Sequence, residues 1–327
     1  MDALSDILRM VGLTGGVFLD AEFTEPWAVS GRVSPESCRP FMAQPQRVVG
    51  FHYVVEGRFT LGLHGQAACE VASGEAVMLP RNDLHVFGSS LALPVIPVGE
   101  LIEPENASGV SKIEHGGGGA RTRLVCGFMG GSGQLDILLS GLPAFLKIDV
   151  AALPGAEWIH QTFAYAARTF GDGEPGAATV LAKVSEVLFV ESVRRYLASL
   201  PPGATGWLAG LRDPVVGRAL SLLHGRPDGD WTAEALAREV NMSRSSFADR
   251  FTHVVGQPPM RYLIGWRMQM ARQKLLETNR PISEIAFQVG YESEAAFTRA
   301  FRREHGAPPA AWRKRGAVPE GLSPFDS

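Results

Sequence analysis

The hydrophobic positions in the last third of the chain recur with helical spacing, and the pattern occurs twice. Phe247 and Phe251 stand four residues apart, and Phe297 and Phe301 repeat this pair 50 residues later. Residues three or four apart share one face of a helix, so each pair predicts a buried helical stripe. The apolar residues before each pair also match, but at an offset of 49: Leu236, Ala237 and Val240 match Ile285, Ala286 and Val289.

This change of offset indicates that each copy consists of two helices joined by a turn, because insertions fall in turns. We predict helix-turn-helix units over residues 232–256 and 282–306, with Ser243 and Ser293 as N-caps of the second helices. The spacing between the units predicts one helix over about residues 260–278, roughly 28 Å long at ~1.5 Å per residue. That length would hold the two second helices about one turn of DNA apart, ~34 Å, in successive major grooves.

The pattern from residue 51 onward is different, with short apolar stretches separated by Gly, Asn-Asp and Pro. It favours an antiparallel β-barrel or sandwich. Helical stretches follow, and the last of them carries more apolar surface than a small barrel needs, so we expect it to pack against a partner helix. Its apolar residues are Val180, Val184, Val187, Leu188 and Leu197. The predicted fold class is α+β, with a β-domain at 1–200, a linker at 201–212, a helical domain at 213–316 and a tail at 317–327.

Composition and charge agree with two globular domains. The chain has 45% hydrophobic and 20% charged residues in 327, and no apolar run approaches the ~18 residues that would span a bilayer. The start lacks the features of a signal peptide, and three scattered cysteines favour neither disulfides nor a zinc cluster, so we expect a cytoplasmic protein. Residues 210–316 carry 17 Lys and Arg against 11 Asp and Glu, a balance of +6, whereas the rest is −9. This asymmetry favours a polyanion as partner, although a solvated helical surface gives the same pattern.

The C-terminal residues resemble the DNA-binding domain of the AraC/XylS family of transcription regulators. The resemblance covers about residues 213–315 and is carried by "EIAFQVGYESEAAFTRAFRREHGAPPAAWR" and by Asp213-Pro214 as a helix start. It implies that the second helix of each unit contacts promoter DNA through its polar positions. These are Ser243, Arg244, Ser245, Ser246, Asp249 and Arg250 in the first unit, and Ser293, Glu294, Thr298, Arg299, Arg302 and Arg303 in the second.

Two of these positions have a specific chemical expectation. A guanidinium at Arg299 can donate two hydrogen bonds to guanine O6 and N7. Asp249 occupies the equivalent position of the first unit, where it could accept from a cytosine amino group or pair with a neighbouring arginine. On the connecting helix we expect Arg267 and Arg272 to contact phosphate or to be solvated.

The N-terminal half is similar to cupin-type sensor domains. "SGEAVMLPRNDLHVF", which contains Asn82 and His85, resembles the second cupin box, while His52 and Glu56 have the spacing of the first, with Gly50 in place of its first histidine. His52 and Glu56 lie four apart on a strand and should share one face. With His85 they could bind a divalent metal, or they could line a metal-free effector pocket. We expect Cys126, which alternates with apolar residues, to be buried.

Together these resemblances imply a homodimeric transcription regulator, an activator that binds promoter DNA and works with RNA polymerase. Its N-terminal half would bind a small-molecule effector and dimerise through its helices. Two alternatives are a cupin-type metal-dependent enzyme fused to a DNA-binding domain, and a dimeric regulator without an effector. We expect no catalytic residues and no membrane partner.

Overall fold

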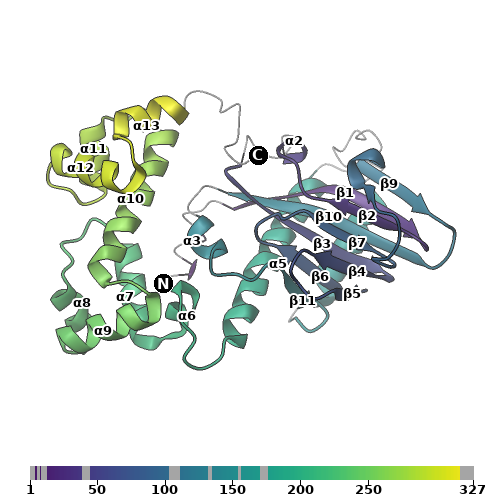
Figure 1. Cartoon of the computed structure of the whole chain (residues 1–327), viewed down its shortest axis with the longest axis horizontal. Coiled ribbons are helices and arrows are strands. Elements are labelled where there is room, and N and C mark those ends of the chain that lie inside the picture. Colours follow the sequence, from purple (N-terminus) through teal and green to yellow (C-terminus); the bar gives the residue numbers. More distant parts are fainter. Residues whose placement is uncertain are drawn as a thin grey trace. The chain divides into compact units, whose positions relative to one another are not determined.

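The computed structural model describes residues 4–5, 8, 13–38, 45–102, 111–131, 135–153, 156–169 and 176–316. The described residues form two compact units: the first consists of residues from 13 to 199, and the second of residues 200–316 together with residues 4, 5 and 8 (Figure 1). The predicted tail at 317–327 lies outside the described residues. None of the described helices is both long enough and apolar enough to pass through a bilayer.

The first unit is built from two packed β-sheets, as the alternating pattern predicts. One sheet has the strand order β11 (Leu146–Asp149), β6 (Glu75–Leu79), β3 (Arg47–Glu56), β10 (Arg121–Gly131), β1 (Thr14–Thr24) and β9 (Ser111–Gly116). The other has the order β5 (Cys69–Ala72), β4 (Arg58–Leu63), β7 (His85–Gly88), β2 (Ala28–Gly31) and β8 (Ile96–Pro97). Most strand pairs are antiparallel, as expected, and the parallel pairs β1–β9 and β2–β8 lie at the sheet edges.

The core of this unit lies between the two sheets. Phe23 and Leu124 from the first sheet pack with Val29, Phe59 and Phe87 from the second. Short helical segments, α2 (Pro35–Cys38), η1 (Val98–Glu100) and α3 (Asp136–Leu139), connect the strands. This interior supplies the walls of the cavity described below.

Two helices cover the outer face of the six-stranded sheet. Helix α5 (Ala177–Ser199) packs on β1, β10 and β11, and α4 (Ala156–Thr169) packs on β3 and α5. The prediction that the apolar stripe of α5 faces a partner is wrong for Val184, Leu188 and Leu197, because they are buried within the unit itself. Val180 and Val187 are the apolar residues of this stripe that stay exposed, at 49% and 45%.

The second unit is all-helical and contains the two predicted helix-turn-helix units. The first is α8 (Ala233–Glu239) with α9 (Arg244–Val255), the second is α11 (Ile282–Gln288) with α12 (Glu294–His305), and α10 (Pro259–Glu277) joins them. The Oγ atoms of Ser243 and Ser293 accept from the N–H groups of Ser246 and Ala296, which confirms both N-caps. The four phenylalanines of the repeat are fully buried.

Residues 207–212 differ from the prediction of a linker. They form helix α6 (Trp207–Arg212), which packs on α7 (Pro214–Gly225) and on α9. Trp207 is only 8% exposed, and its indole N–H donates to the Tyr262 hydroxyl on α10 at 2.9 Å. The sequence predicts a linker over the whole segment because Pro and Gly at 201–206 are turn signals, and the short helix after them was therefore missed. Helix α13 (Pro309–Gly316) completes the unit.

Candidate functional site

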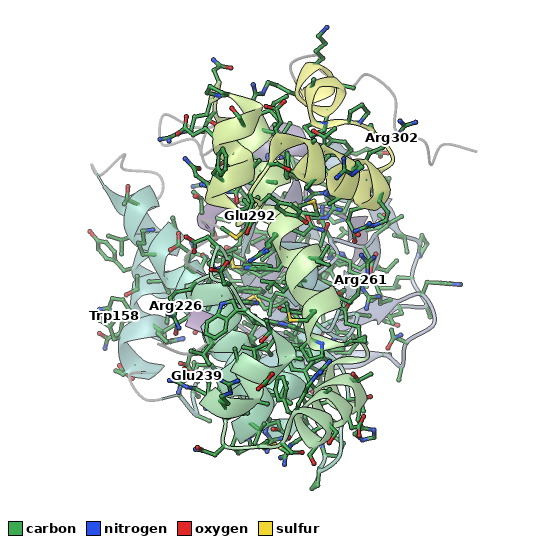
Figure 2. The ribbon with its side chains drawn as sticks, turned by 90° about the vertical axis from the view of Figure 1, so that its left-hand side faces the viewer. Trp158, Arg226, Glu239, Arg261, Glu292 and Arg302 are labelled. Carbon is green, nitrogen blue, oxygen red and sulfur yellow. The ribbon has the colours of Figure 1, made fainter. Side chains whose placement is uncertain are left out.

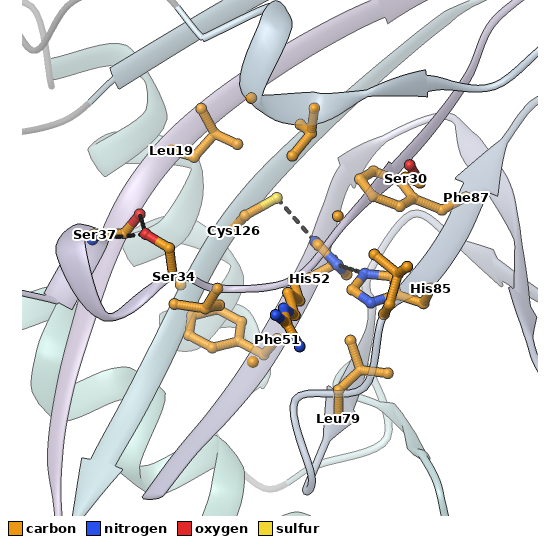
Figure 3. Close-up of a pocket in the computed structure, with 18 of the residues that line it drawn as sticks. Leu19, Ser30, Ser34, Ser37, Phe51, His52, Leu79, His85, Phe87 and Cys126 are labelled. Atoms are coloured by element: carbon orange, nitrogen blue, oxygen red, sulfur yellow. Dashed lines mark hydrogen bonds between the residues drawn. The ribbon is translucent and has the colours of Figure 1, made fainter. Parts of the chain in front are cut away.

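A cavity of about 290 Å³ opens among strands of both sheets of the first unit. Its size falls at the lower end of the range for small-molecule sites, ~300–1,000 Å³. Most of the lining is apolar and comes from β1, β2, β3, β6, β7, β10 and the segment around η1 (Figure 3). The principal apolar side chains are Leu19, Val33, Phe51, Leu79, Phe87 and Val98.

Three polar side chains form a hydrogen-bonded chain along one wall of this cavity. Nδ1 of His85 lies 2.9 Å from the carbonyl oxygen of Asp83, Nε2 of His85 lies 2.7 Å from Nε2 of His52, and Nδ1 of His52 lies 2.9 Å from Sγ of Cys126 (Figure 3). A carbonyl can only accept, so His85 carries its proton on Nδ1. The network then assigns the remaining donors: His52 donates from Nε2 to His85, and Cys126 donates to Nδ1 of His52.

Burial keeps this chain uncharged. The pKa of His52 lies well below its ordinary value, mainly because the ring is buried and to a smaller extent because His85 is its neighbour. Burial also lowers the pKa of His85, against a smaller opposing effect of the Asp83 carbonyl. Burial raises the pKa of the Cys126 thiol, and the Asp20 carboxylate adds a smaller effect in the same direction. The prediction that Cys126 is buried is confirmed, but the sequence did not reveal its contact with His52.

Glu56 does not join the two histidines, contrary to the prediction. Strand β3 pairs with β10 so that Val54 lies opposite Leu124 and Glu56 lies opposite Arg123. Two steps along β3 therefore match one step along β10, which makes a β-bulge, and the extra residue reverses the alternation of faces. Glu56 is exposed, and its Oε2 lies 3.6 Å from Nη1 of Arg121.

The donor set does not fit the metal that the cupin resemblance implies. Gly50 replaces the first histidine, Glu56 lies on the other face of the sheet, and the Nε2 atoms of His52 and His85 are hydrogen-bonded to each other. Within the described ranges, no three His, Cys, Asp or Glu side chains are grouped so as to hold a metal ion. The predicted ligand set of His52, Glu56 and His85 is therefore incomplete.

Asn82 and Gly50 shape one end of the cavity. Asn82 has φ +53°, a left-handed angle that asparagine tolerates. Its side-chain amide donates to Val33 O at 2.8 Å and accepts from Val33 N at 2.9 Å, which fixes the segment after β2. A Cβ at Gly50 would lie 3.4 Å from Val33 Cγ2 and 3.5 Å from Asn82 Oδ1. The absence of a side chain at Gly50 therefore leaves room inside the cavity.

The second unit presents a different kind of surface, made of the polar faces of α9 and α12. Arg244, Ser245, Ser246 and Asp249 are exposed on α9. On α12, Glu294, Arg299, Arg302 and Arg303 are exposed and Thr298 is half-buried (Figure 2, Arg302). Considering only described residues, the side chains of Arg299, Arg302 and Asp249 have no hydrogen-bond or ion-pair partner. These side chains are free to contact a ligand.

Two arginines of this unit differ from their predicted roles. Arg250 of α9 donates to the carboxylate of Asp213, with Nη2 2.8 Å from Oδ2, so it is held on the scaffold rather than directed outward. Arg267 of α10 is half-buried, and its guanidinium donates to the carbonyls of Pro227, Gly229 and Gly290 at 2.7–3.0 Å. Arg267 therefore joins the loop between α7 and α8 to the turn between α11 and α12, and it is neither solvated nor placed for a phosphate contact.

The comparisons with known proteins cover both units. Residues 2–198 match the family model described as cupin, and residues 236–315 match the model described as a helix-turn-helix domain. An AraC-like transcription regulator from Streptomyces lividans is 32% identical over 98% of this chain and 100% of its own length. The transcriptional regulator AlkR from Acinetobacter baylyi is 27% identical over 96% of this chain and 100% of its own. The RCS-specific transcriptional activator RclR from Escherichia coli is 26% identical over 96% and 98%.

Proposed function

Because the chain belongs to the AraC-like family of transcription regulators, we propose that a small molecule bound beside His52 and His85 controls how it binds promoter DNA. Its relatives are named as transcription regulators and not as enzymes. The observation that carries the proposal is the apolar cavity of about 290 Å³ inside the cupin unit. It matches small-molecule sites in its concavity, its apolar lining and its few polar groups.

We propose that α9 and α12 enter successive major grooves. The ~28 Å length of α10 separates them by about one turn of DNA. Arg299 donates to the edge of a guanine, and Asp249 accepts from a cytosine amino group. The other exposed polar residues of both helices contact phosphates and flanking bases: Arg244, Ser245 and Ser246 on α9, and Glu294, Thr298, Arg302 and Arg303 on α12. Ser243 and Ser293 act chiefly as caps, since their Oγ atoms are already bonded to the backbone.

We propose that the regulator is a homodimer that pairs through α4 and α5. Trp158 and Tyr165 on α4 are 58% and 45% exposed (Figure 2, Trp158). Val180 and Val187 on α5 are 49% and 45% exposed. Each pair is seven residues apart, so each lies along one face of its helix. Large apolar side chains gathered on one surface are typical of protein–protein contacts, and a second copy would bury them.

We further propose that the protein activates transcription from the cytoplasm together with RNA polymerase. The support is the name of the Escherichia coli relative, a transcriptional activator that matches almost the whole chain. The effector would act by favouring one arrangement of the dimer's DNA-binding units over another.

The test begins by selecting duplexes that bind the purified full-length protein from a random-sequence library. The selected duplex then serves as probe while a metabolite library is screened for compounds that stabilise the protein against heat and change its DNA affinity. We expect at least one compound to do both. If the protein binds its selected DNA but every stabilising compound leaves the DNA affinity unchanged, the effector-independent dimeric regulator replaces this proposal.

A further inference from the structure

The charges around the cavity restrict what it can bind. None of the described residues that line it is acidic, so a bound cation would have no counter-ion. Among the described lining residues Arg32 is the one fixed cation, and it is exposed to solvent, whereas His52 and His85 are buried and hydrogen-bonded to each other. Burying a charge without a partner is strongly unfavourable. An uncharged ligand avoids that cost.

The volume sets the size of the ligand. A cavity of about 290 Å³ lies near the lower end of the range for small-molecule sites, ~300–1,000 Å³, so the ligand is small. The apolar side chains that dominate the lining would contact most of its surface. Leu84 lines the cavity and is 63% exposed, so an apolar side chain also stands where the cavity meets solvent.

The facing ring nitrogens specify the polar group of the ligand. Nε2 of His52 carries a proton and Nε2 of His85 carries a lone pair, because the chain from Asp83 O to Cys126 Sγ fixes both tautomers. A hydroxyl is a donor and an acceptor at once, so one hydroxyl can accept from His52 while it donates to His85. An ether or a carboxylate can satisfy only His52, and an ammonium can satisfy only His85.

Resting on the proposed function, we propose that the effector is a small, uncharged, mainly apolar alcohol or phenol whose hydroxyl bridges His52 and His85. Binding replaces the direct hydrogen bond between the rings by two bonds through the ligand oxygen. The rings then move apart on strands β3 and β7, which belong to different sheets. The same event therefore fills the cavity and alters the spacing between the two sheets.

The experiment compares matched probes on the full-length protein by calorimetry and thermal shift. One set is octan-1-ol, its methyl ether, octanoate and octylammonium, and the other is 4-ethylphenol, its methyl ether, 4-methylbenzoate and 4-methylbenzylammonium. In at least one set we expect the hydroxyl compound to bind at least tenfold more tightly than the ether and both ions. The proposal is overturned if no probe binds, if an ion binds as tightly as the alcohol or phenol, or if the ether does.

A substitution separates the bridge from the apolar fit. In His85→Phe the acceptor is lost but the wall stays apolar, so the preference for the hydroxyl compound over its methyl ether should disappear. An unchanged preference would remove His85 from the site. Should His85→Phe fail to fold, the ranking of the probes on the unsubstituted protein still decides the proposal.

Failure of this inference and failure of the proposed function have different signatures. If the hydroxyl compound binds as expected but does not change affinity for the selected duplex, the ligand class stands and the effector role fails. If a charged compound binds and changes DNA affinity, effector control stands and the ligand class assigned here is wrong.

Discussion

The guanidinium of Arg250 is bonded to the carboxylate of Asp213, with Nη2 2.8 Å and Nε 3.0 Å from Oδ2. The same carboxylate caps α7, because Oδ1 accepts from the N–H groups of Val215 and Val216 at 2.9 Å. Burial alone would raise the pKa of this carboxyl, but the bonds from Arg250, Val216 and Val215 bring it below its ordinary value. Helix α9 is thus fixed to the scaffold by Arg250, and most of the exposed arginines of the two polar faces lie on α12.

Replacing Arg299 by alanine should weaken binding to the selected duplex by about 1–3 kcal/mol, because one bidentate contact to a guanine is lost. Specificity at that base should relax at the same time. The measurement is a gel-shift titration against the selected duplex and against duplexes changed at single positions.

Arg218→Ala is the matched control, since Arg218 is an exposed arginine on α7, outside both recognition helices. Its loss removes the same charge and should cost much less affinity. Equal losses for the two variants would mean that Arg299 contributes only general attraction to the polyanion.

Val187→Arg should convert the dimer to monomers without unfolding the protein. Val187 is 45% exposed in the single chain, so arginine is tolerated there, but a second copy packed on α5 would bury the new charge. Sedimentation velocity checks the oligomeric state, and circular dichroism checks the fold. Val95→Arg makes the same change at a 40% exposed valine elsewhere and should leave the dimer intact. A dimeric Val187→Arg protein would exclude this face of α5 as the interface.

The helix-turn-helix units could be predicted because their signals are local. Each second helix has a serine cap at its start and a glycine at its end, and Gly256 and Gly306 do adopt positive φ angles of 87° and 74°. The repeat supplied a second, independent copy of the same signals. Such elements follow from sequence alone because the residues that define them lie within one or two turns of one another.

The errors at Glu56, Arg250, Arg267 and Leu188 share one physical cause, which is dependence on residues far away in the chain. The face of Glu56 is set by a bulge that arises only when β3 pairs with β10. The partner of Arg250 lies 37 residues away, and those of Arg267 lie 23 to 40 residues away. Leu188 is buried by its own sheet, which the spacing of apolar residues on α5 cannot distinguish from burial by a second copy.

The stability of the helical unit should fall as the pH is lowered from 7 to 5. Burial lowers the pKa of His224 to about 3, so it stays neutral in the folded unit while the unfolded chain takes up a proton near pH 6.5. The unfolded state therefore binds more protons as the pH falls, and the loss should reach about 2 kcal/mol at pH 5. Urea titrations at pH 5, 6 and 7 measure it.

His224→Gln tests whether His224 is the source of that pH dependence. Nε2 of His224 lies 2.6 Å from the Tyr262 hydroxyl. Glutamine offers an oxygen acceptor to that hydroxyl but does not titrate in this range. The variant should be less sensitive to pH than the unsubstituted protein, whatever its absolute stability. An equally steep decline in both proteins would assign the effect to other groups.

His85→Asn should abolish or blunt the response to effector, whereas Glu56→Gln should leave it unchanged. His85 lines the cavity and bonds to His52 at 2.7 Å, while Glu56 is exposed on the opposite face of the sheet. Binding of both variants to the selected duplex without effector should persist, because the recognition helices belong to a separate unit. A reporter assay with the hydroxyl compound that binds most tightly gives the comparison. A normal response from His85→Asn would mean that the histidine pair is scaffold, and a lost response from Glu56→Gln would place the effector on the other face of the sheet.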